Sequence, residues 1–363
     1  MSPRRVLVMA GGTGGHVFPA LALARLLRDA GHRVTWLGTR RGLEARVVPA
    51  AGFDIDWIDI GGLRGKGLKS LLAAPWHLLR ALWGALAILR HRDPELVVGL
   101  GGFVTGPGGL AAWLQRRPLL IHEQNAVAGL TNRWLAHLAH EVLAAFPGAF
   151  AGARRVRVIG NPVRADIAAL QPPQERYGRR SGPLRLLVVG GSLGAARLNT
   201  VVPEALALLR AQGMDVPEVL HQTGEAGLAA TCAAYRAAGL EARVEPFVED
   251  MAQAYASADL VICRAGALTV SELAAAGLPA ILVPYPHAVD DHQTRNAQWL
   301  VAAGAALCLA DAALTPAQLC AGLQDLGLDR PGLAARASRA RAQAKPDAAH
   351  AMMDRCLAAL EAR

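Results

Sequence analysis

The sequence predicts an α/β protein built from two doubly wound, Rossmann-like domains, each with a parallel sheet. Three observations lead to this fold class. Short apolar runs alternate with longer helical patterns along the whole chain, which favours parallel strands joined by right-handed crossovers. A length of 363 residues exceeds one ordinary core and suits two domains. A strand, a glycine-rich turn and a helix also follow one another near the start of each half.

The expected strands form two sets of six. The first set covers residues 5–9, 33–37, 96–99, 119–122, 142–144 and 156–159. The second covers residues 184–189, 218–221, 242–245, 260–263, 280–283 and 306–308. Among the helical patterns between them are 19–30, 43–51, 198–212 and 268–276. The glycine and proline at positions 160–162 predict a boundary there, with domains at 1–162 and 163–345 and a helical segment at 346–363.

Composition and cysteine usage exclude several classes of protein. Hydrophobic residues make up 53% and charged residues 18%, so we expect a globular chain and not a disordered one. No uncharged apolar run approaches 18 residues, so we expect no membrane-spanning helix. The first apolar stretch, residues 6–10, is too short for a signal peptide. The five cysteines have no C-x-x-C spacing and are interpreted as reduced thiols without a metal cluster.

The positive charge is concentrated in the first half. Residues 1–163 contain 20 Lys and Arg against 9 Asp and Glu, a net charge of +11. Residues 164–363 contain 18 against 20, a net charge of −2. The first half is therefore expected to meet an anionic partner, such as a lipid surface or a pyrophosphate. We expect no nucleic acid, because no nucleic-acid-binding motif occurs.

Two glycine-rich turns point to phosphate binding. Residues 11–16 read Gly-Gly-Thr-Gly-Gly-His, and residues 190–195 read Gly-Gly-Ser-Leu-Gly-Ala. Glycines let the backbone approach an anion closely, and the following helix N-terminus adds unpaired N–H groups. The dinucleotide fingerprint fits poorly because Val17 stands where its third glycine belongs, and the P-loop motif is absent. Two tight turns that bind no ligand are the other interpretation.

Nine short stretches along the chain match the motifs of a known protein family. They lie at residues 11–20, 62–67, 101–107, 122–125, 128–132, 160–164, 190–192, 263–272 and 292–297. In this order they resemble the peptidoglycan UDP-N-acetylglucosamine transferase family, whose members have the two-domain GT-B fold with a cleft between the domains. The resemblance covers nearly the whole chain. It implies that residues 1–162 bind the acceptor and a membrane, that residues 163–345 bind the donor, and that the C-terminal helix packs back on the first domain.

The resemblance also implies the residues that bind UDP-N-acetylglucosamine. Arg164 would bind the pyrophosphate, the Val248 backbone would pair with uracil, Glu272 would accept hydrogen bonds from the ribose, and Gln293 would hold the sugar hydroxyls. The full set is Thr13, Gly14, Gly15, Asn125, Arg164, Ser192, Val248, Ala267, Leu268, Thr269, Val270, Ser271, Glu272 and Gln293. For Arg164 and Glu272 the alternatives are a surface arginine after a linker and a helix-start carboxylate.

The activity implied is transfer of N-acetylglucosamine to the 4-hydroxyl of undecaprenyl-diphospho-MurNAc-pentapeptide, with inversion to a β-1,4 linkage. His16 is the expected general base and Glu123 the second candidate, although His16 could only position a ligand and Glu123 could only orient a loop. No metal or other cofactor is expected, because a helix N-terminus and Arg164 would stabilise the departing UDP. The stretch 54–56 spells D-x-D but is interpreted as solvated charge on an alternating edge strand.

Residues 64–92 combine basic and large apolar side chains. The expected membrane patch consists of Lys69, Leu72, Trp76, Leu79, Arg80, Leu82 and Trp83. Tryptophan beside lysine and arginine is typical of a membrane interface, and the alternative is a crossover helix that buries its apolar stripe on the sheet. The family is peripheral on the inner leaflet, at the cytoplasmic face of the inner membrane. Other cell-wall synthesis proteins are possible partners there.

Three other functions stay open on the sequence. The first is another GT-B transferase that moves a UDP-sugar to a lipid acceptor. The second is a UDP-N-acetylglucosamine epimerase of the same fold, which would need no basic membrane patch. The third is a protein that binds a nucleotide sugar or lipid without catalysis.

Overall fold

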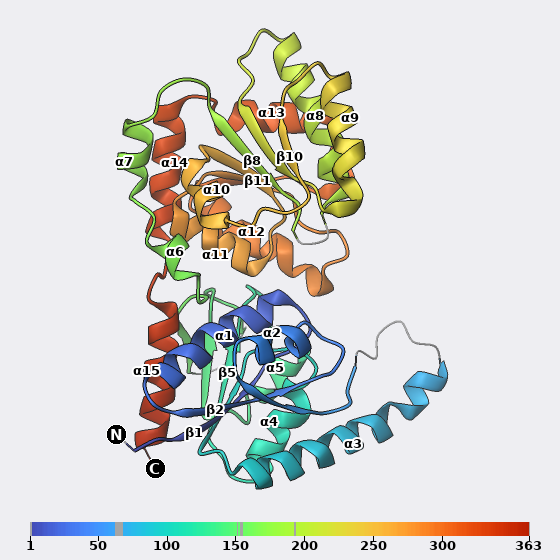
Figure 1. The fold of residues 1–363 in the computed structure, drawn as a ribbon, viewed down its shortest axis with the longest axis vertical. Coiled ribbons are helices and arrows are strands. Elements are labelled where there is room, and N and C mark those ends of the chain that lie inside the picture. The colour runs from blue at the N-terminus through green and yellow to red at the C-terminus, as the bar shows by residue number, and fades with distance from the viewer. Residues whose placement is uncertain (1, 62–67, 151, 153–154, 192–193, 363) are drawn as a thin grey trace. The chain divides into compact units, whose positions relative to one another are not determined.

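The computed structural model describes residues 2–61, 68–150, 152, 155–191 and 194–362, with only the backbone described for residues 68–73 and 289. These residues form two compact units, one of residues 1–162 with 346–363 and one of residues 163–345. Each unit contains one parallel sheet covered by helices (Figure 1). The predicted class, two parallel-sheet Rossmann-like units, is confirmed.

The first unit has a seven-stranded parallel sheet in the order β3-β2-β1-β4-β5-β6-β7. Its strands are β1 (Arg5–Met9), β2 (Arg33–Gly38), β3 (Asp54–Trp57), β4 (Leu96–Gly99), β5 (Leu119–Glu123), β6 (Glu141–Ala144) and β7 (Val156–Val158). Its helices are α1 (Gly14–Asp29), α2 (Glu44–Ala50), α3 (Leu68–Arg92), α4 (Thr105–Leu114), α5 (Leu130–Leu135) and α15 (Ala348–Glu361). β1 and β4 are fully apolar from residues 6 and 96 on and are buried on both faces, as central parallel strands must be.

The C-terminal helix belongs to the first unit although it is the last element of the chain. α15 lies beside α1 (Figure 1). Met352 and Cys356 of α15 are fully buried in the core cluster that also holds Leu23 and Leu27 of α1. Arg355 adds a pair of hydrogen bonds to the Glu141 carboxylate at 2.8 and 2.9 Å. The apolar stripe of α15 therefore completes the core on one face of the sheet.

The second unit has a six-stranded parallel sheet in the order β10-β9-β8-β11-β12-β13. Its strands are β8 (Arg185–Val189), β9 (Glu218–Gln222), β10 (Arg243–Glu245), β11 (Leu260–Cys263), β12 (Ala280–Leu282) and β13 (Ala306–Cys308). Its α-helices are α6 (Ala165–Ala168), α7 (Pro173–Gly178), α8 (Ala196–Ala211), α9 (Leu228–Ala237), α10 (Met251–Ser257), α11 (Ala267–Ala276), α12 (His292–Ala302), α13 (Pro316–Leu326) and α14 (Arg330–Ala342). Short 3-10 turns cover Glu225–Gly227, Val289–Asp291 and Asp311–Ala313.

Two differences from the predicted elements have physical explanations. The helix expected from residue 19 begins at Gly14, with Pro19 buried inside it. Proline has no N–H to donate and is well tolerated only in a first turn, so the local sequence favours a start near Pro19. The first sheet has a seventh strand, β3, outside the predicted set of six. β3 is the alternating edge strand expected around the D-x-D stretch, and it spans four partly exposed residues.

Candidate active site

In the first unit the strand order reverses between β1 and β4, and in open α/β sheets the crevice at such a point is the usual ligand site. The glycine-rich turn after β1 meets the loop after β4, because the Gly11 N–H donates to the Gly101 carbonyl oxygen at 3.3 Å. The loop after β5 joins them, because Gln124 Nε2 donates to the Leu100 carbonyl oxygen at 2.7 Å. The sequence motifs at 11–16, 101–107 and 122–125 are thus brought together at one sheet edge.

His16 lies in the first turn of α1, with its ring against Gly101. A Cβ added at Gly101 would be 2.6 Å from the ring carbon Cδ2 of His16, and Gly101 has a φ of +108°. Glycine at this position therefore makes room for the imidazole. His16 Nδ1 lies 3.2 Å from the Gly11 carbonyl oxygen. If Nδ1 carries the proton and donates to this carbonyl, Nε2 is the basic nitrogen.

Thr13, Gly14 and Gly15 form the N-terminus of α1. Thr13 is the N-cap residue and has extended backbone, and its carbonyl oxygen accepts hydrogen bonds from the N–H groups of His16 and Val17 at 3.1 and 3.2 Å. The N–H groups at the start of a 16-residue helix attract anions through their orientation and the helix dipole. This placement suits a phosphate-type ligand.

The Glu123 carboxylate is buried and receives four hydrogen bonds. Oε1 accepts from the backbone N–H and the side-chain Nδ2 of Asn125 at 3.0 and 3.1 Å. Oε2 accepts from the Gly129 N–H at 3.2 Å and from Asn132 Nδ2 at 2.9 Å. With both oxygens engaged in holding the loop after β5, the geometry favours the loop-orienting interpretation of Glu123 over that of a base. Asn125 is positioned by this carboxylate.

In the second unit the strand order reverses between β8 and β11. α11 begins directly after β11, so Ala267, Leu268 and Thr269 make up its first turn at the carboxyl edge of the sheet. Val270 is buried, and the Ser271 hydroxyl donates to the Ala267 carbonyl oxygen at 2.9 Å. The first turn of α11 therefore points its helix N-terminus to this sheet edge, whereas the Ser271 hydroxyl is engaged within the helix. Ser192, in the turn after β8, lies outside the described residues.

Glu272 lies in the second turn of α11, one turn later than a helix-start carboxylate. Tyr255 of α10 donates its buried hydroxyl to Glu272 Oε2 at 3.2 Å. Burial raises the pKa of Glu272 from 4.5 to about 7, against the opposing effects of this hydrogen bond and of the Arg164 guanidinium. A carboxylate kept in an unfavourable environment beside an arginine is typical of a functional site.

Arg164 is the N-cap residue of α6 and forms an ion pair with Asp166, with 2.6 Å between Nη2 and Oδ2. Its guanidinium lowers the pKa of the Asp166 carboxyl. The Arg164 side chain is 52% exposed, so the ion pair is open to solvent and to competing anions. Gln293, at the start of α12, accepts a hydrogen bond from the Tyr285 N–H at 2.8 Å through Oε1. That bond anchors the loop after β12 to α12.

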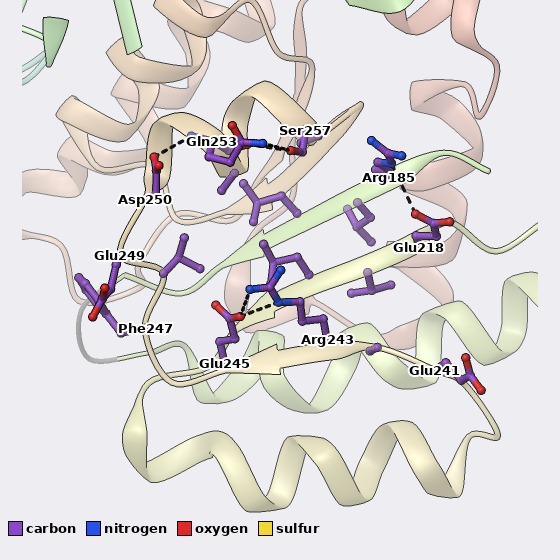
Figure 2. A pocket seen from close by; sticks show the side chains of 18 residues that line it. Arg185, Glu218, Glu241, Arg243, Glu245, Phe247, Glu249, Asp250, Gln253 and Ser257 are labelled. Carbon is purple, nitrogen blue, oxygen red and sulfur yellow. Dashed lines mark hydrogen bonds and ion pairs between the residues drawn. The ribbon is translucent and has the colours of Figure 1, made fainter. Parts of the chain in front are cut away.

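A cavity of about 1030 Å³ lies over β8, β9 and β10 and beside α10 (Figure 2). Among the described residues of the predicted donor set, Val248 alone lines this cavity. Two ion pairs lie along its wall (Figure 2). Arg185 Nε is 3.5 Å from Glu218 Oε2, and Arg243 Nη2 is 2.5 Å from Glu245 Oε1. Glu272 and the first turn of α11 lie outside its lining, so among the described donor residues Val248 is the point at which the cavity and the predicted site coincide.

Two side chains that contact predicted donor residues could not be assigned a role from the sequence. Tyr255 supports Glu272 from 17 positions away, and Asp166 pairs with Arg164. Asp166 had a local signal, because an acidic residue two positions after an arginine can pair with it. Tyr255 had none, because only the packing of α10 beside α11 brings its hydroxyl to the carboxylate.

The described residues contain no group of three or more His, Cys, Asp or Glu side chains arranged to hold a metal ion. The D-x-D stretch at 54–56 is paired with an arginine. Asp56 accepts two hydrogen bonds from Arg92, at 2.7 and 3.2 Å, and Asp54 lies 3.5 Å from the same guanidinium. These contacts tie the end of α3 to the edge strand β3.

The predicted membrane patch lies on α3. Trp76, Leu79 and Trp83 are 69%, 51% and 65% exposed, and Arg80 is exposed beside them. Leu82 differs, because it is half-buried and packs against the core of the first unit. It therefore belongs to the inner face of the helix. The side chains of Lys69 and Leu72 lie outside the described residues. Across the part of the chain that the structure describes, no helix is both long and apolar enough to span a membrane.

Two parallel-sheet units, each with a helix N-terminus suited to bind phosphate at its switch point, are the arrangement of the GT-B fold. Residues 6–144 match the N-terminal domain of glycosyltransferase family 28, and residues 185–352 match its C-terminal domain. The chain belongs to this family.

Curated relatives and solved structures agree with this assignment. A protein of Marinobacter nauticus is 56% identical over 98% of both chains, and one of Halorhodospira halophila is 58% identical over 96% of both. Both are named UDP-N-acetylglucosamine–N-acetylmuramyl-(pentapeptide) pyrophosphoryl-undecaprenol N-acetylglucosamine transferase. The crystal structure of Acinetobacter baumannii MurG is 42% identical, with a TM-score of 0.87 over 98% of this chain and all of that one. The calicheamicin glycosyltransferase CalG4, at 20% identity and a TM-score of 0.71, shares the fold.

Proposed function

We propose that this chain transfers N-acetylglucosamine from UDP-N-acetylglucosamine to the 4-hydroxyl of undecaprenyl-diphospho-MurNAc-pentapeptide, giving a β-1,4-linked disaccharide in peptidoglycan synthesis. The observation that carries the proposal is identity of 54–58% over nearly the full length to relatives named for this reaction. Described residues of four motifs, at 11–16, 101–107, 122–125 and 263–272, lie at the carboxyl edges of the two sheets, which supports the proposal.

The second unit would hold the donor. The first-turn N–H groups of α11 and the Arg164 guanidinium would bind the diphosphate, with Arg164 exchanging its Asp166 partner for the ligand. The Glu272 carboxylate would accept hydrogen bonds from the ribose hydroxyls. The Val248 backbone would pair with uracil, and Gln293 would bind the sugar through its amide.

The first unit would hold the acceptor and the base. The N-terminus of α1 would bind the acceptor phosphates. His16 Nε2 would take the proton of the 4-hydroxyl as its oxygen attacks the anomeric carbon. The bond from that carbon to UDP breaks in the same displacement, which inverts its configuration, and the electron pair leaves on UDP. The α11 N-terminus and Arg164 would stabilise this growing negative charge from fixed positions. Glu123 would hold Asn125 and its loop in place.

The exposed face of α3 would bind the anionic surface of the inner leaflet at the cytoplasmic side, where the acceptor lipid resides. Two exposed tryptophans and a leucine beside Arg80 provide apolar anchors and positive charge. Trp113 of α4, which packs against α3, is 48% exposed and extends this face. Cosedimentation with vesicles should require anionic lipid and should fall in a Trp76→Ser/Trp83→Ser variant. Equal binding of that variant would refute the assignment.

The function is tested by incubating the purified protein with radiolabelled UDP-N-acetylglucosamine and a lipid-linked MurNAc-pentapeptide analogue, with EDTA present. We expect labelled lipid product with this donor and none with UDP-glucose. Binding of the donor without transfer would overturn the proposed acceptor. Conversion of the free nucleotide sugar to its epimer would favour the epimerase alternative.

A further inference from the structure

Glu44, which no sequence motif singled out, is a carboxylate buried beside the first glycine-rich turn. It is the first residue of α2, and its side chain is fully buried. Oε2 accepts a hydrogen bond from the Gly12 N–H at 2.9 Å. Oε1 accepts from the N–H and the hydroxyl of Thr39 at 3.0 and 2.7 Å. An ionised carboxylate is costly to bury unless donors of this kind compensate it.

Three glycines leave the space that this carboxylate fills. A Cβ added at Gly11 would be 2.6 Å from Glu44 Oε1, and one at Gly38 would be 2.9 Å from Glu44 Cγ. A Cβ at Gly42 would overlap the carboxylate itself. Since real Cβ atoms avoid such distances, the end of β1, the end of β2 and the start of α2 all depend on glycine to pack around one side chain.

Gly12, to which Glu44 is hydrogen-bonded, is fixed at both its backbone N–H and its carbonyl oxygen. Besides the bond from the Gly12 N–H to Glu44, the Gly12 carbonyl oxygen accepts a hydrogen bond from the Leu43 N–H at 3.3 Å. Gly12 has a φ of +90°, which side chains disfavour. Thr13 and the first turn of α1, which carries His16, follow immediately. The direction in which α1 starts is therefore set by contacts from residues 43 and 44.

We propose that Glu44 is a positioning residue for the transfer reaction, holding the glycine-rich turn so that His16 and the α1 N-terminus meet the acceptor. This inference rests on the proposed function. The Gly12 N–H is occupied by Glu44, so the donors for an acceptor phosphate are those of the following helix start. A glutamine at position 44 tests these hydrogen bonds specifically, because each carboxylate oxygen of Glu44 faces an N–H donor. An amide has one acceptor oxygen, so its NH₂ would face a donor and one bond would be lost.

Glu44→Gln is expected to lower kcat/KM for the lipid acceptor at least tenfold. Tenfold corresponds to about 1.4 kcal/mol, the size of one hydrogen bond to a charged group. The dissociation constant of UDP should stay within twofold of wild type, because the groups proposed to bind uracil, ribose and the diphosphate lie in the other unit. Amide hydrogen exchange at Gly12 should accelerate. If the glutamine variant does not fold, Glu44→Asp is used instead. It keeps the charge but is one methylene shorter, so it should also lower kcat/KM and accelerate exchange at Gly12.

Glu141→Gln is the matched control. Glu141 is a largely buried carboxylate of the first unit with two arginine partners, and it begins β6 at the opposite edge of the sheet. If Glu141→Gln lowers the melting temperature as much as Glu44→Gln and loses as much activity, the effect is loss of stability and the proposal fails. Wild-type kcat/KM in a folded Glu44→Gln variant would also overturn it. If wild-type protein transfers no sugar, the proposed function fails, and unchanged exchange at Gly12 would separately refute the role of Glu44 in holding the turn.

Discussion

Replacing Glu272 by glutamine should stabilise the second unit while weakening donor binding. The carboxyl of Glu272 has its pKa raised from 4.5 to about 7 by burial. Between these two pH values the native state binds the proton more tightly than the unfolded chain, so the free energy of unfolding falls as pH rises through this window. Above the upper pH value the carboxyl is ionised in both states, and the full cost of burying its charge lowers the free energy of unfolding. At 1.36 kcal/mol per pKa unit, a rise from 4.5 to about 7 amounts to about 3 kcal/mol.

Glutamine has nearly the same shape and no charge, and its amide oxygen can still accept the Tyr255 hydroxyl. The variant should therefore lose the pH dependence and gain up to about 3 kcal/mol over wild type at pH 8, with little gain near pH 5. Urea unfolding followed by circular dichroism from pH 5 to pH 8.5 measures this difference. The transition of the second unit is identified in the wild type as the one that UDP shifts to higher urea concentration.

The same variant separates stability from function. Calorimetric titration at pH 8 should show weaker UDP binding by roughly tenfold, since a neutral amide is a poorer acceptor for ribose hydroxyls than a carboxylate. A variant as stable as wild type at both ends of the pH range would refute the reasoning. It would mean that solvent or Arg164 already compensates the charge of Glu272.

Three further predictions concern single contacts. Tyr255→Phe removes a donor to the Glu272 carboxylate, so it should raise the pKa of Glu272 further. The pH midpoint of UDP binding, measured by titration from pH 6 to pH 9, should move upward by about one unit. An unchanged midpoint would contradict this. His16→Ala should lower kcat by about 10²–10⁴-fold with UDP affinity unchanged, and a rate within threefold of wild type would exclude His16 as the base. Asp259 is fully buried and paired with Arg180, so Asp259→Ala should cost about 3–5 kcal/mol in urea unfolding, and a loss below 1 kcal/mol would show that the pair is dispensable.

The predicted strands lie within one residue of the observed ones at both ends, because apolar runs and glycine turns are local signals. The strand expected at residues 5–9 is β1, and those at 96–99 and 260–263 are β4 and β11. Helix starts were less accurate. α1 begins five residues before the expected position at 19, because packing of Val17 and Ala20 into the core outweighs the cost of an internal proline.

Only those site residues that come directly after a strand in the sequence could be placed at a sheet edge in advance. His16 and the first turn of α11 come directly after strands, so their place at a sheet edge follows from the order of the sequence. The roles of Glu123 and Arg164 depend on partners that the sequence does not reveal. Four donors converge on Glu123, and Asp166 competes for Arg164.

Local patterns were sufficient to predict the fold class, the two glycine-rich turns and the chemistry available at the strand ends, because each depends on neighbours within a few residues. Tertiary structure decided which carboxylates are buried and what holds them. Glu44 lies in a short stretch that resembles an ordinary helix start, yet Gly11 and Gly38, at the ends of two strands, enclose it together with the neighbouring Gly42. Glu272 acquires its raised pKa from burial, opposed by Tyr255 and Arg164, neither of which is near it in sequence. Desolvation and hydrogen bonding depend on distances in space, and only the packed chain sets them.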